Sequence, residues 1–135
     1  MTRSDFQQLA DVRIDEAGVL LVAGKWDGAY YLAGYAVECA LKACIAKLTR
    51  AEDFPPREVK DYYTHDLNVL LKTAKLHSAR DSEGANPTFD TYWRVVVLWK
   101  EDARYKRTTQ SDAENICKAV SDPTDGVLRW IRLHW

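Results

Sequence analysis

The segment Lys100-Glu-Asp-Ala-Arg-Tyr-Lys-Arg107 holds the densest group of cations in the chain, with an aromatic side chain among them. A tyrosine can stack on a nucleobase while neighbouring arginines hold phosphate. The predicted ligand-binding residues for a nucleotide or RNA are therefore Arg104, Tyr105 and Arg107. The alternative is a helix C-terminus at which cations complement the helix dipole and Arg104 pairs with Glu101 or Asp102.

Other ionisable groups could take part in catalysis or binding, and each also has a structural explanation. Glu38 precedes Lys42 by four residues, the favourable order for an ion pair along a helix. We predict this pair in preference to a perturbed carboxylate at a subunit interface. His65 lies in the first turn of a predicted helix, where we expect a local hydrogen bond in preference to a role as ligand or base.

Composition narrows the function classes further. The 135 residues suit one domain, and 19 basic against 20 acidic side chains leave a net charge of -1, so no global field draws the chain to nucleic acid or an anionic membrane. No metal-ligand spacing, Gly-rich phosphate loop or Ser-His-Asp set is visible, so no metal or cofactor is expected. Three cysteines without a C-x-x-C spacing predict buried thiols in a reducing compartment. The absence of a secretory signal and of a membrane span predicts a cytoplasmic location.

Hydrophobic periodicity of three to four residues predicts an all-α bundle that forms a single domain over residues 1–135. The expected helices cover residues 5–23, 28–48, 65–75, 87–105, 111–121 and 127–134. Residues 49–63, which contain two adjacent prolines, are expected to be a loop, and the polar segment 77–84 a mobile loop. Gly24 should end the first helix, and the predicted N-caps are Asp27, Thr64, Asn86 and Ser111.

The expected helix over residues 28–48 is small or apolar on nearly every side, so its whole surface must be covered. A connection of only a few residues after Gly24 places it antiparallel to the first helix. It is then either the central helix of a bundle or a helix shared between two subunits. We expect it to carry a homodimer interface.

Four segments carry a family resemblance in their order and spacing. Residues 15–42 end in Ala-x-Glu-x-x-Leu-Lys, and Thr64-His-Asp-Leu67 followed by Leu70-Leu71 gives a His-x-Leu-x-x-Leu-Leu element. Ala103-Arg-Tyr105 supplies an Arg-Tyr pair, and residues 113–131 supply a closing helix. Together they resemble the HEPN domain family. The resemblance implies an up-and-down bundle of four to five helices, often a homodimer, that pairs with a small nucleotidyltransferase, commonly as toxin and antitoxin.

Some members of that family are metal-independent ribonucleases with the motif Arg-x(4-6)-His, which Arg129-Trp-Ile-Arg-Leu-His134 matches. Histidine can take a proton from the ribose 2'-hydroxyl while arginine stabilises charge on the phosphate. The resemblance thus implies Arg129 and His134 as catalytic residues. The alternative is that Arg129 and Arg132 are solvated cations on a terminal helix. This chain also departs from the family pattern, because Trp130 stands where a polar residue is usual.

The leading hypothesis is a HEPN-like interaction module in a toxin-antitoxin or related defence pair. It would form a homodimer, work with a nucleotidyltransferase partner, associate with RNA or a nucleotide, and make no contact with a membrane. The alternative hypotheses are a metal-independent endoribonuclease using Arg129 and His134, and a plain nucleotide or RNA binder using the cluster near residue 104.

Overall fold

The structure is a computed structural model that describes residues 1–48 and 63–135. Its elements, in chain order, are α1 (Arg3–Val22), α2 (Trp26–Leu48), α4 (Leu67–Thr73), α5 (His77–Glu83), α6 (Pro87–Val97), the 3-10 helix η2 (Glu101–Tyr105), α7 (Gln110–Ser121) and α8 (Val127–Arg132). The described residues contain no strand, which confirms the all-α prediction. They contain seven α-helices, where periodicity predicts six and the HEPN resemblance implies four to five. The loop predicted over residues 49–63 lies, apart from residue 63, outside the described residues.

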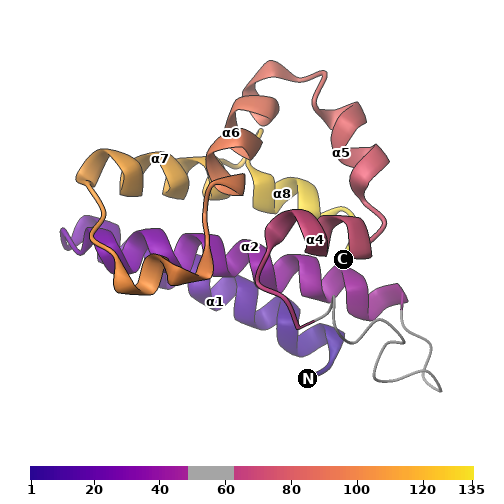
Figure 1. Cartoon of the computed structure of the whole chain (residues 1–135), viewed down its shortest axis with the longest axis horizontal. Helices are drawn as coiled ribbons and strands as arrows, with labels where there is room; N and C mark the ends of the chain where they lie inside the picture. The colour runs from indigo at the N-terminus through magenta and orange to yellow at the C-terminus, as the bar shows by residue number, and fades with distance from the viewer. Residues whose placement is uncertain (49–62) are drawn as a thin grey trace.

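The two longest helices, α1 and α2, form the predicted antiparallel hairpin (Figure 1). Gly24 adopts φ +77° at the turn, a backbone conformation that favours glycine, as expected for the end of a helix. Asp27 is not the cap of α2, because it lies within the first turn of that helix. Its carboxylate instead accepts a hydrogen bond of 2.6 Å from the backbone N–H of Thr108 and so ties the hairpin turn to the segment before α7.

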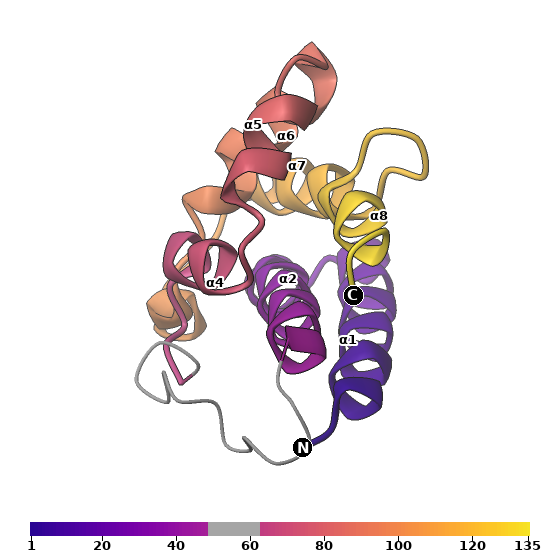
Figure 2. The ribbon, with the colours of Figure 1, turned by 90° about the vertical axis from the view of Figure 1, so that its right-hand side faces the viewer.

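Helix α2 is the central helix of the bundle (Figure 2). Helix α1 packs along one side of it, α7 and α8 along a second, and α4 with η2 along a third. The small side chains of α2 are fully covered within this one chain, since the exposed fraction is 0% for Ala29, Ala33, Ala36, Ala40 and Ala43. A second subunit is therefore not needed to cover these side chains, which supports the alternative of a central helix, and a homodimer interface on α2 stays a prediction.

Two of the predicted helix caps are wrong by two residues. Helix α4 is capped by Asp66, whose carboxylate accepts two backbone N–H groups of the first turn, while Thr64 accepts from the Asp66 amide. Helix α7 is capped by Thr109, whereas Ser111 lies inside the helix. Asn86 caps α6 as predicted, with proline at the first helical position.

The prediction of a mobile loop over residues 77–84 is wrong, because residues 77–83 form helix α5. None of its residues is buried, and with α6 it stands out from the rest of the bundle (Figures 1 and 2). Charged contacts hold it: Arg80 lies 3.4 Å from Asp90 and 5.9 Å above the Trp93 ring, and Glu83 lies 3.7 Å from Arg129. The absence of apolar anchors in this segment therefore did not exclude a helix.

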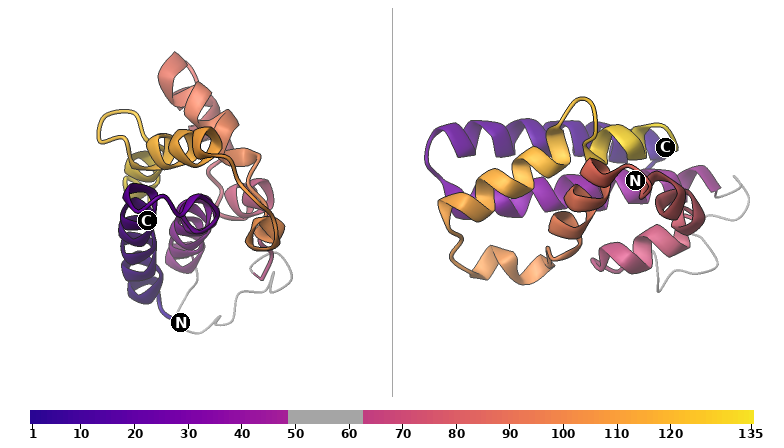
Figure 3. Two further views of the ribbon diagram at one scale, coloured as in Figure 1. Left: turned by 90° about the vertical axis from the view of Figure 1, so that its left-hand side faces the viewer. Right: turned by 90° about the horizontal axis from the view of Figure 1, so that it is seen from above.

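Helix α6 ends eight residues before the predicted position, at Val97. The chain turns there so that Trp99 enters the bundle, with 2% of its surface exposed, while Leu98 is left 74% exposed. Residues 101–105 resume as the short helix η2, which lies over α2 on the side opposite α1 (Figure 3). The last helix, α8, ends at Arg132, two residues earlier than expected.

Candidate functional site

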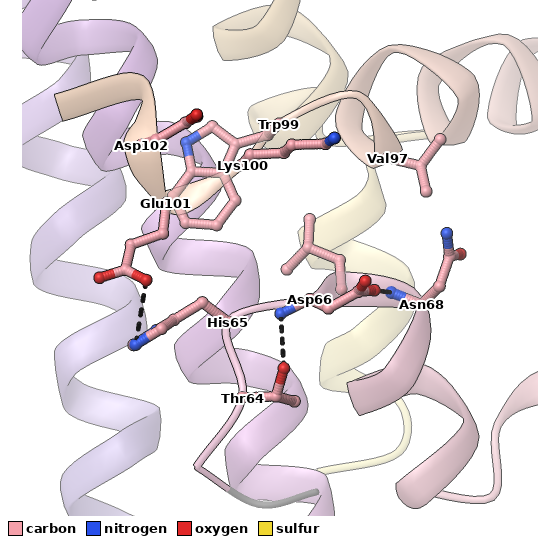
Figure 4. A pocket seen from close by; sticks show the side chains of 10 residues that line it. Thr64, His65, Asp66, Asn68, Val97, Trp99, Lys100, Glu101 and Asp102 are labelled. Carbon is pink, nitrogen blue, oxygen red and sulfur yellow. Dashed lines mark hydrogen bonds and ion pairs between the residues drawn. The ribbon is translucent and has the colours of Figure 1, made fainter. Parts of the chain in front are cut away.

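A groove of about 540 Å³ lies between the segment that leads into α4 and the segment that joins α6 to η2 (Figure 4). Thr64–Asn68 form one wall, and Val97 with Trp99–Asp102 form the other. Both walls belong to elements that pack against α2. The groove therefore brings together two parts of the chain that are well separated in sequence.

A buried carboxylate from α2 lies beside this groove. Glu38 is 1% exposed, and its Oε1 accepts a hydrogen bond of 3.0 Å from Lys42 Nζ. The same oxygen lies 2.8 Å from His65 Nδ1. The Glu38–Lys42 pair was predicted and is confirmed, but it is buried and not exposed or half-buried. His65 makes no local bond of the kind expected and instead reaches across 27 residues to α2.

The other ring nitrogen of His65 extends this contact to the opposite wall of the groove. Nε2 lies 3.3 Å from Glu101 Oε2, and Glu101 in turn pairs with Arg104 at 3.0 Å (Figure 4). A neutral ring donates to one of the two carboxylates, whereas an imidazolium would donate to both. The contacts run from Lys42 through Glu38, His65 and Glu101 to Arg104. This network joins α2, the start of α4 and η2.

An indole forms the deep end of the second wall. Trp99 lies against Gly34 of α2 so closely that a Cβ at this glycine would be 2.2 Å from two atoms of its ring. The ring also contacts Tyr31, with ring centroids 6.0 Å apart. Trp99 Nε1 and Glu38 Oε2 are two buried atoms for which the described residues supply no hydrogen-bond partner. Glycine at position 34 is thus what lets the wall of the groove sit directly on the central helix.

The structure places the predicted ligand-binding residues at the end of η2, beside the groove. Arg104 lies over the ring of the exposed Tyr105, with 4.8 Å from the guanidinium carbon to the ring centroid. Arg104 is paired with Glu101, as the structural alternative expected. Arg107 lies apart from them in a second hollow of about 180 Å³ that Tyr30 also lines. Arg104 and Tyr105 thus lie together, whereas Arg107 lines a different hollow.

The residues implied as catalytic, Arg129 and His134, lie at the C-terminal end of the bundle and not at the groove. Arg129 pairs with Glu83 of α5 at 3.7 Å, and its buried Nε has no hydrogen-bond partner among the described residues. The His134 ring packs edge-on against Trp130, with centroids 5.2 Å apart. Burial lowers the pKa of His134, Lys47 lowers it further, and Glu83 opposes both effects. Glu83 therefore acts on both members of the motif, although no hydrogen bond or ion pair in the described chain joins one to the other.

The lowered pKa of His134 predicts a pH dependence of stability. The folded chain disfavours the imidazolium, so the unfolded chain binds the proton more readily. The stability contributed by the neutral ring is present above the ordinary value of 6.5 and is lost as pH falls through the lower folded pKa. An NMR titration of the ring should give a midpoint below 6.5. His134→Gln should remove this component from the pH profile of unfolding, and a midpoint at or above the ordinary value would contradict it.

The cysteines are buried and free, as predicted: Cys39 is 1% exposed, Cys44 3% and Cys117 5%. Burial raises the pKa of Cys39 to about 12, and those of Cys44 and Cys117 to about 11. Because the thiolate is the reactive form, we expect the folded protein to resist a disulfide reagent that titrates all three thiols in urea. Rapid reaction of any thiol in the folded state would show that the site is more open than its burial implies.

Two further features of the described residues bear on the site. They contain no group of three or more His, Cys, Asp or Glu side chains arranged to hold a metal ion. None of their helices combines the length and the apolar character that crossing a membrane requires.

The fold and the groove define an all-helical bundle protein whose central helix carries a buried Glu-Lys pair, tied to a groove by a histidine. A comparison with family models, with characterised proteins and with solved structures finds no match to this chain. The sequence predicts the Glu38–Lys42 pair but not the contacts of His65 with Glu38 and Glu101. The available signal was a carboxylate surrounded by apolar neighbours on a helix that must be buried.

Proposed function

We propose that this chain is a HEPN-like interaction module that acts together with a nucleotidyltransferase partner in a toxin-antitoxin or related defence pair. In this proposal the chain forms a homodimer, and RNA or a nucleotide is the molecule on which the pair acts. The groove beside Glu38 and the exposed end of η2 are the surfaces that meet the partner.

The observation that carries the proposal is a convergence in space. Glu38 and Lys42 come from the Ala-x-Glu-x-x-Leu-Lys segment and His65 from the His-x-Leu element. Glu101 joins His65 to Arg104, which belongs to the segment with the Arg-Tyr pair. Three of the four segments that resemble the HEPN family therefore supply one charge network. If each segment resembled the family only by chance, nothing would require the segments to lie together in the folded chain.

Electrostatics favour an interaction module over a surface that binds nucleic acid by itself. In the cluster near residue 104, Arg104 is paired with Glu101 and Lys106 with Asp102. Phosphate would have to displace these carboxylates to use either cation. Because affinity for nucleic acid comes largely from phosphate contacts, a surface on which two of the four cations are already paired is a weaker phosphate site than its sequence implies.

A growth assay tests the proposal. The chain is expressed from an inducible promoter with and without the nucleotidyltransferase gene that neighbours it, and the two proteins are purified through a tag on one of them. We expect slowed growth with one protein of the pair alone, relief on co-expression, and co-purification. Lack of a neighbouring nucleotidyltransferase gene, or of any complex between the two proteins, would contradict the proposal.

A metal-independent ribonuclease remains the second candidate, because the lowered pKa of His134 favours the neutral imidazole that a general base requires. In this case cleavage of RNA should persist in EDTA and be lost in His134→Ala and Arg129→Ala. Arg94→Ala is the matched control, since Arg94 is a largely exposed arginine that also pairs with a carboxylate. Cleavage that survives His134→Ala would remove this candidate.

A further inference from the structure

Helix α5 is weakly held against the rest of the bundle (Figure 1). None of its seven residues is buried, and no side chain caps its first turn. Its only apolar side chain, Ala79, is partly buried, and charged contacts connect Arg80 to α6 and Glu83 to α8. A segment with few buried apolar contacts opens at a lower free energy than the core does, and salt screens charged contacts at a surface.

The chain is anchored on both sides of α5. Leu76, which precedes the helix, is 8% exposed, and the Asn86 side chain donates a hydrogen bond of 2.8 Å to Asp125. Between α4 and α5, Lys75 adopts φ +60°, a left-handed conformation that is uncommon for residues other than glycine. Residues at the ends of elements can absorb the backbone change of a hinge. The helix can therefore open as a unit while α4 and α6 stay in place.

Glu83 of α5 is a loose partner for Arg129 of α8. The two side chains lie 3.7 Å apart, whereas charge-assisted hydrogen bonds are usually about 2.7–2.9 Å long. The buried Nε of Arg129 has no hydrogen-bond partner among the described residues. A guanidinium carries five N–H donors, so the contact with Glu83 leaves most of them unused. An oxyanion that fits the guanidinium better can replace this carboxylate.

The charges around the end of α8 favour such an anion. Lys47 Nζ lies 3.4 Å from the carbonyl oxygen of His134, and Lys47 forms no ion pair within the described part of the chain. Lys47 lowers the pKa of His134 and Glu83 raises it, so both charges act on this end of α8. Two cations, Lys47 and Arg129, are thus balanced by one carboxylate, and that carboxylate belongs to the weakly held helix.

We infer that α5 is a cover that opens as a unit, and that Glu83 occupies an oxyanion site on Arg129 while the cover is closed. When α5 opens, a phosphate group or another oxyanion takes the place of Glu83 on the guanidinium. A ligand that binds only the open form shifts the population toward that form. The inference goes beyond the proposed interaction module. It adds a regulation to the ribonuclease candidate without depending on that activity.

Amide hydrogen exchange of the full chain tests whether the cover opens. Arg80 and Gly84 donate backbone hydrogen bonds that hold the helix together, so the amides of residues 80–84 report on it. They should exchange about tenfold faster than those of α2 or more, at a rate that low urea leaves unchanged and higher salt increases. Exchange of these amides only through global unfolding would overturn the inference.

Binding of inorganic phosphate, followed by NMR through the Arg129 Nε–H signal, tests the anion site. Glu83→Gln should raise the affinity about tenfold or more, because the closed form no longer competes. Arg80→Ala should raise it as well, since it loosens the cover without touching Arg129. Asp81→Asn is the matched control, because Asp81 is a carboxylate of the same helix that faces His77 and Arg80. It should leave the affinity unchanged.

Two results would overturn the anion site. One is equal phosphate affinity in Glu83→Gln and the parent chain. The other is binding that survives Arg129→Gln, which would mean an adventitious ion only. The ribonuclease candidate is judged separately, by RNA cleavage. Lack of cleavage in the parent chain and in Glu83→Gln would remove that candidate, while the phosphate and exchange results would still decide whether α5 is a cover.

Discussion

Replacing Gly34 by alanine is expected to lower the free energy of unfolding by about 2 kcal/mol or more. The new Cβ would lie 2.2 Å from the Trp99 ring, so the indole or the central helix has to move. Overpacking costs about 1–3 kcal/mol and at times more, and an overlap with several atoms of a buried ring belongs at the upper end of this range. The better helix propensity of alanine returns only about 1 kcal/mol, which leaves a net loss of about 2 kcal/mol or more. This loss is a large share of the total free energy of unfolding, which is only about 5–15 kcal/mol for domains of this size. Urea unfolding followed by circular dichroism and by tryptophan fluorescence measures it.

The matched control is Gly18→Ala, another glycine inside a long helix. Its added Cβ meets nothing within 4 Å, so at concentrations where the chain is monomeric it should gain stability where Gly34→Ala loses it. Trp99→Leu combined with Gly34→Ala should cost less than the two changes added together, since the smaller side chain makes room for the methyl group. Equal stability of Gly34→Ala and the parent chain would show that the contact is not tightly packed.

The contact between Gly34 and Trp99 also shows where prediction from sequence ended. The α1–α2 hairpin could be predicted because its signals are local: a glycine at the turn, apolar residues every three to four positions, and a helix with no polar side. The end of α6 has no such signal. Its apolar pattern continues past Val97, and the chain turns there because Trp99 finds a deeper site against a glycine 65 positions earlier.

The prediction for the segment that forms helix α5 failed for the opposite reason. Its sequence has almost no apolar side chains, so periodicity predicted a loop. The segment forms a helix whose charged side chains, Arg80 and Glu83, find partners on α6 and α8. Those partners lie elsewhere in the chain, and charge alone does not identify them.

The candidate site was predictable in its parts and not in its assembly. The spacing of Glu38 and Lys42 predicts their pair because both lie on one turn of one helix. The link from His65 to Glu38 depends on how α4 packs on α2, and the link to Glu101 depends on the early end of α6. Both are tertiary outcomes, so sequence could assign His65 only a local partner.

The second large effect is expected from Glu38. Glu38→Ala should lower the free energy of unfolding by about 3–5 kcal/mol, the usual cost of removing one member of a buried ion pair. Here the loss falls on the Lys42 ammonium, whose side chain is 11% exposed, and on His65 at the same time. Glu38→Gln should cost less, since it keeps the shape and one acceptor oxygen.

The half-exposed pair of Arg13 and Glu16 on α1 is the control for this series. Its members lie 2.6 Å apart, with side chains 31% and 43% exposed. Glu16→Ala should change stability by no more than about 1 kcal/mol, because solvent screens a pair at the surface. A similar cost for Glu16→Ala and Glu38→Ala would mean that burial does not set the strength of the inner pair.

A double variant distinguishes charge pairing from packing. Glu38→Leu with Lys42→Met replaces the pair by apolar side chains, and such replacements of buried pairs are often neutral or stabilising. We therefore expect the double variant to be more stable than Glu38→Ala. It should still loosen the groove, because His65 loses its contact with α2 while keeping Glu101. We expect faster amide exchange in residues 63–67 without loss of global stability. The reason is that the Glu38 carboxylate holds the wall of the groove in place, through His65, more than it stabilises the bundle.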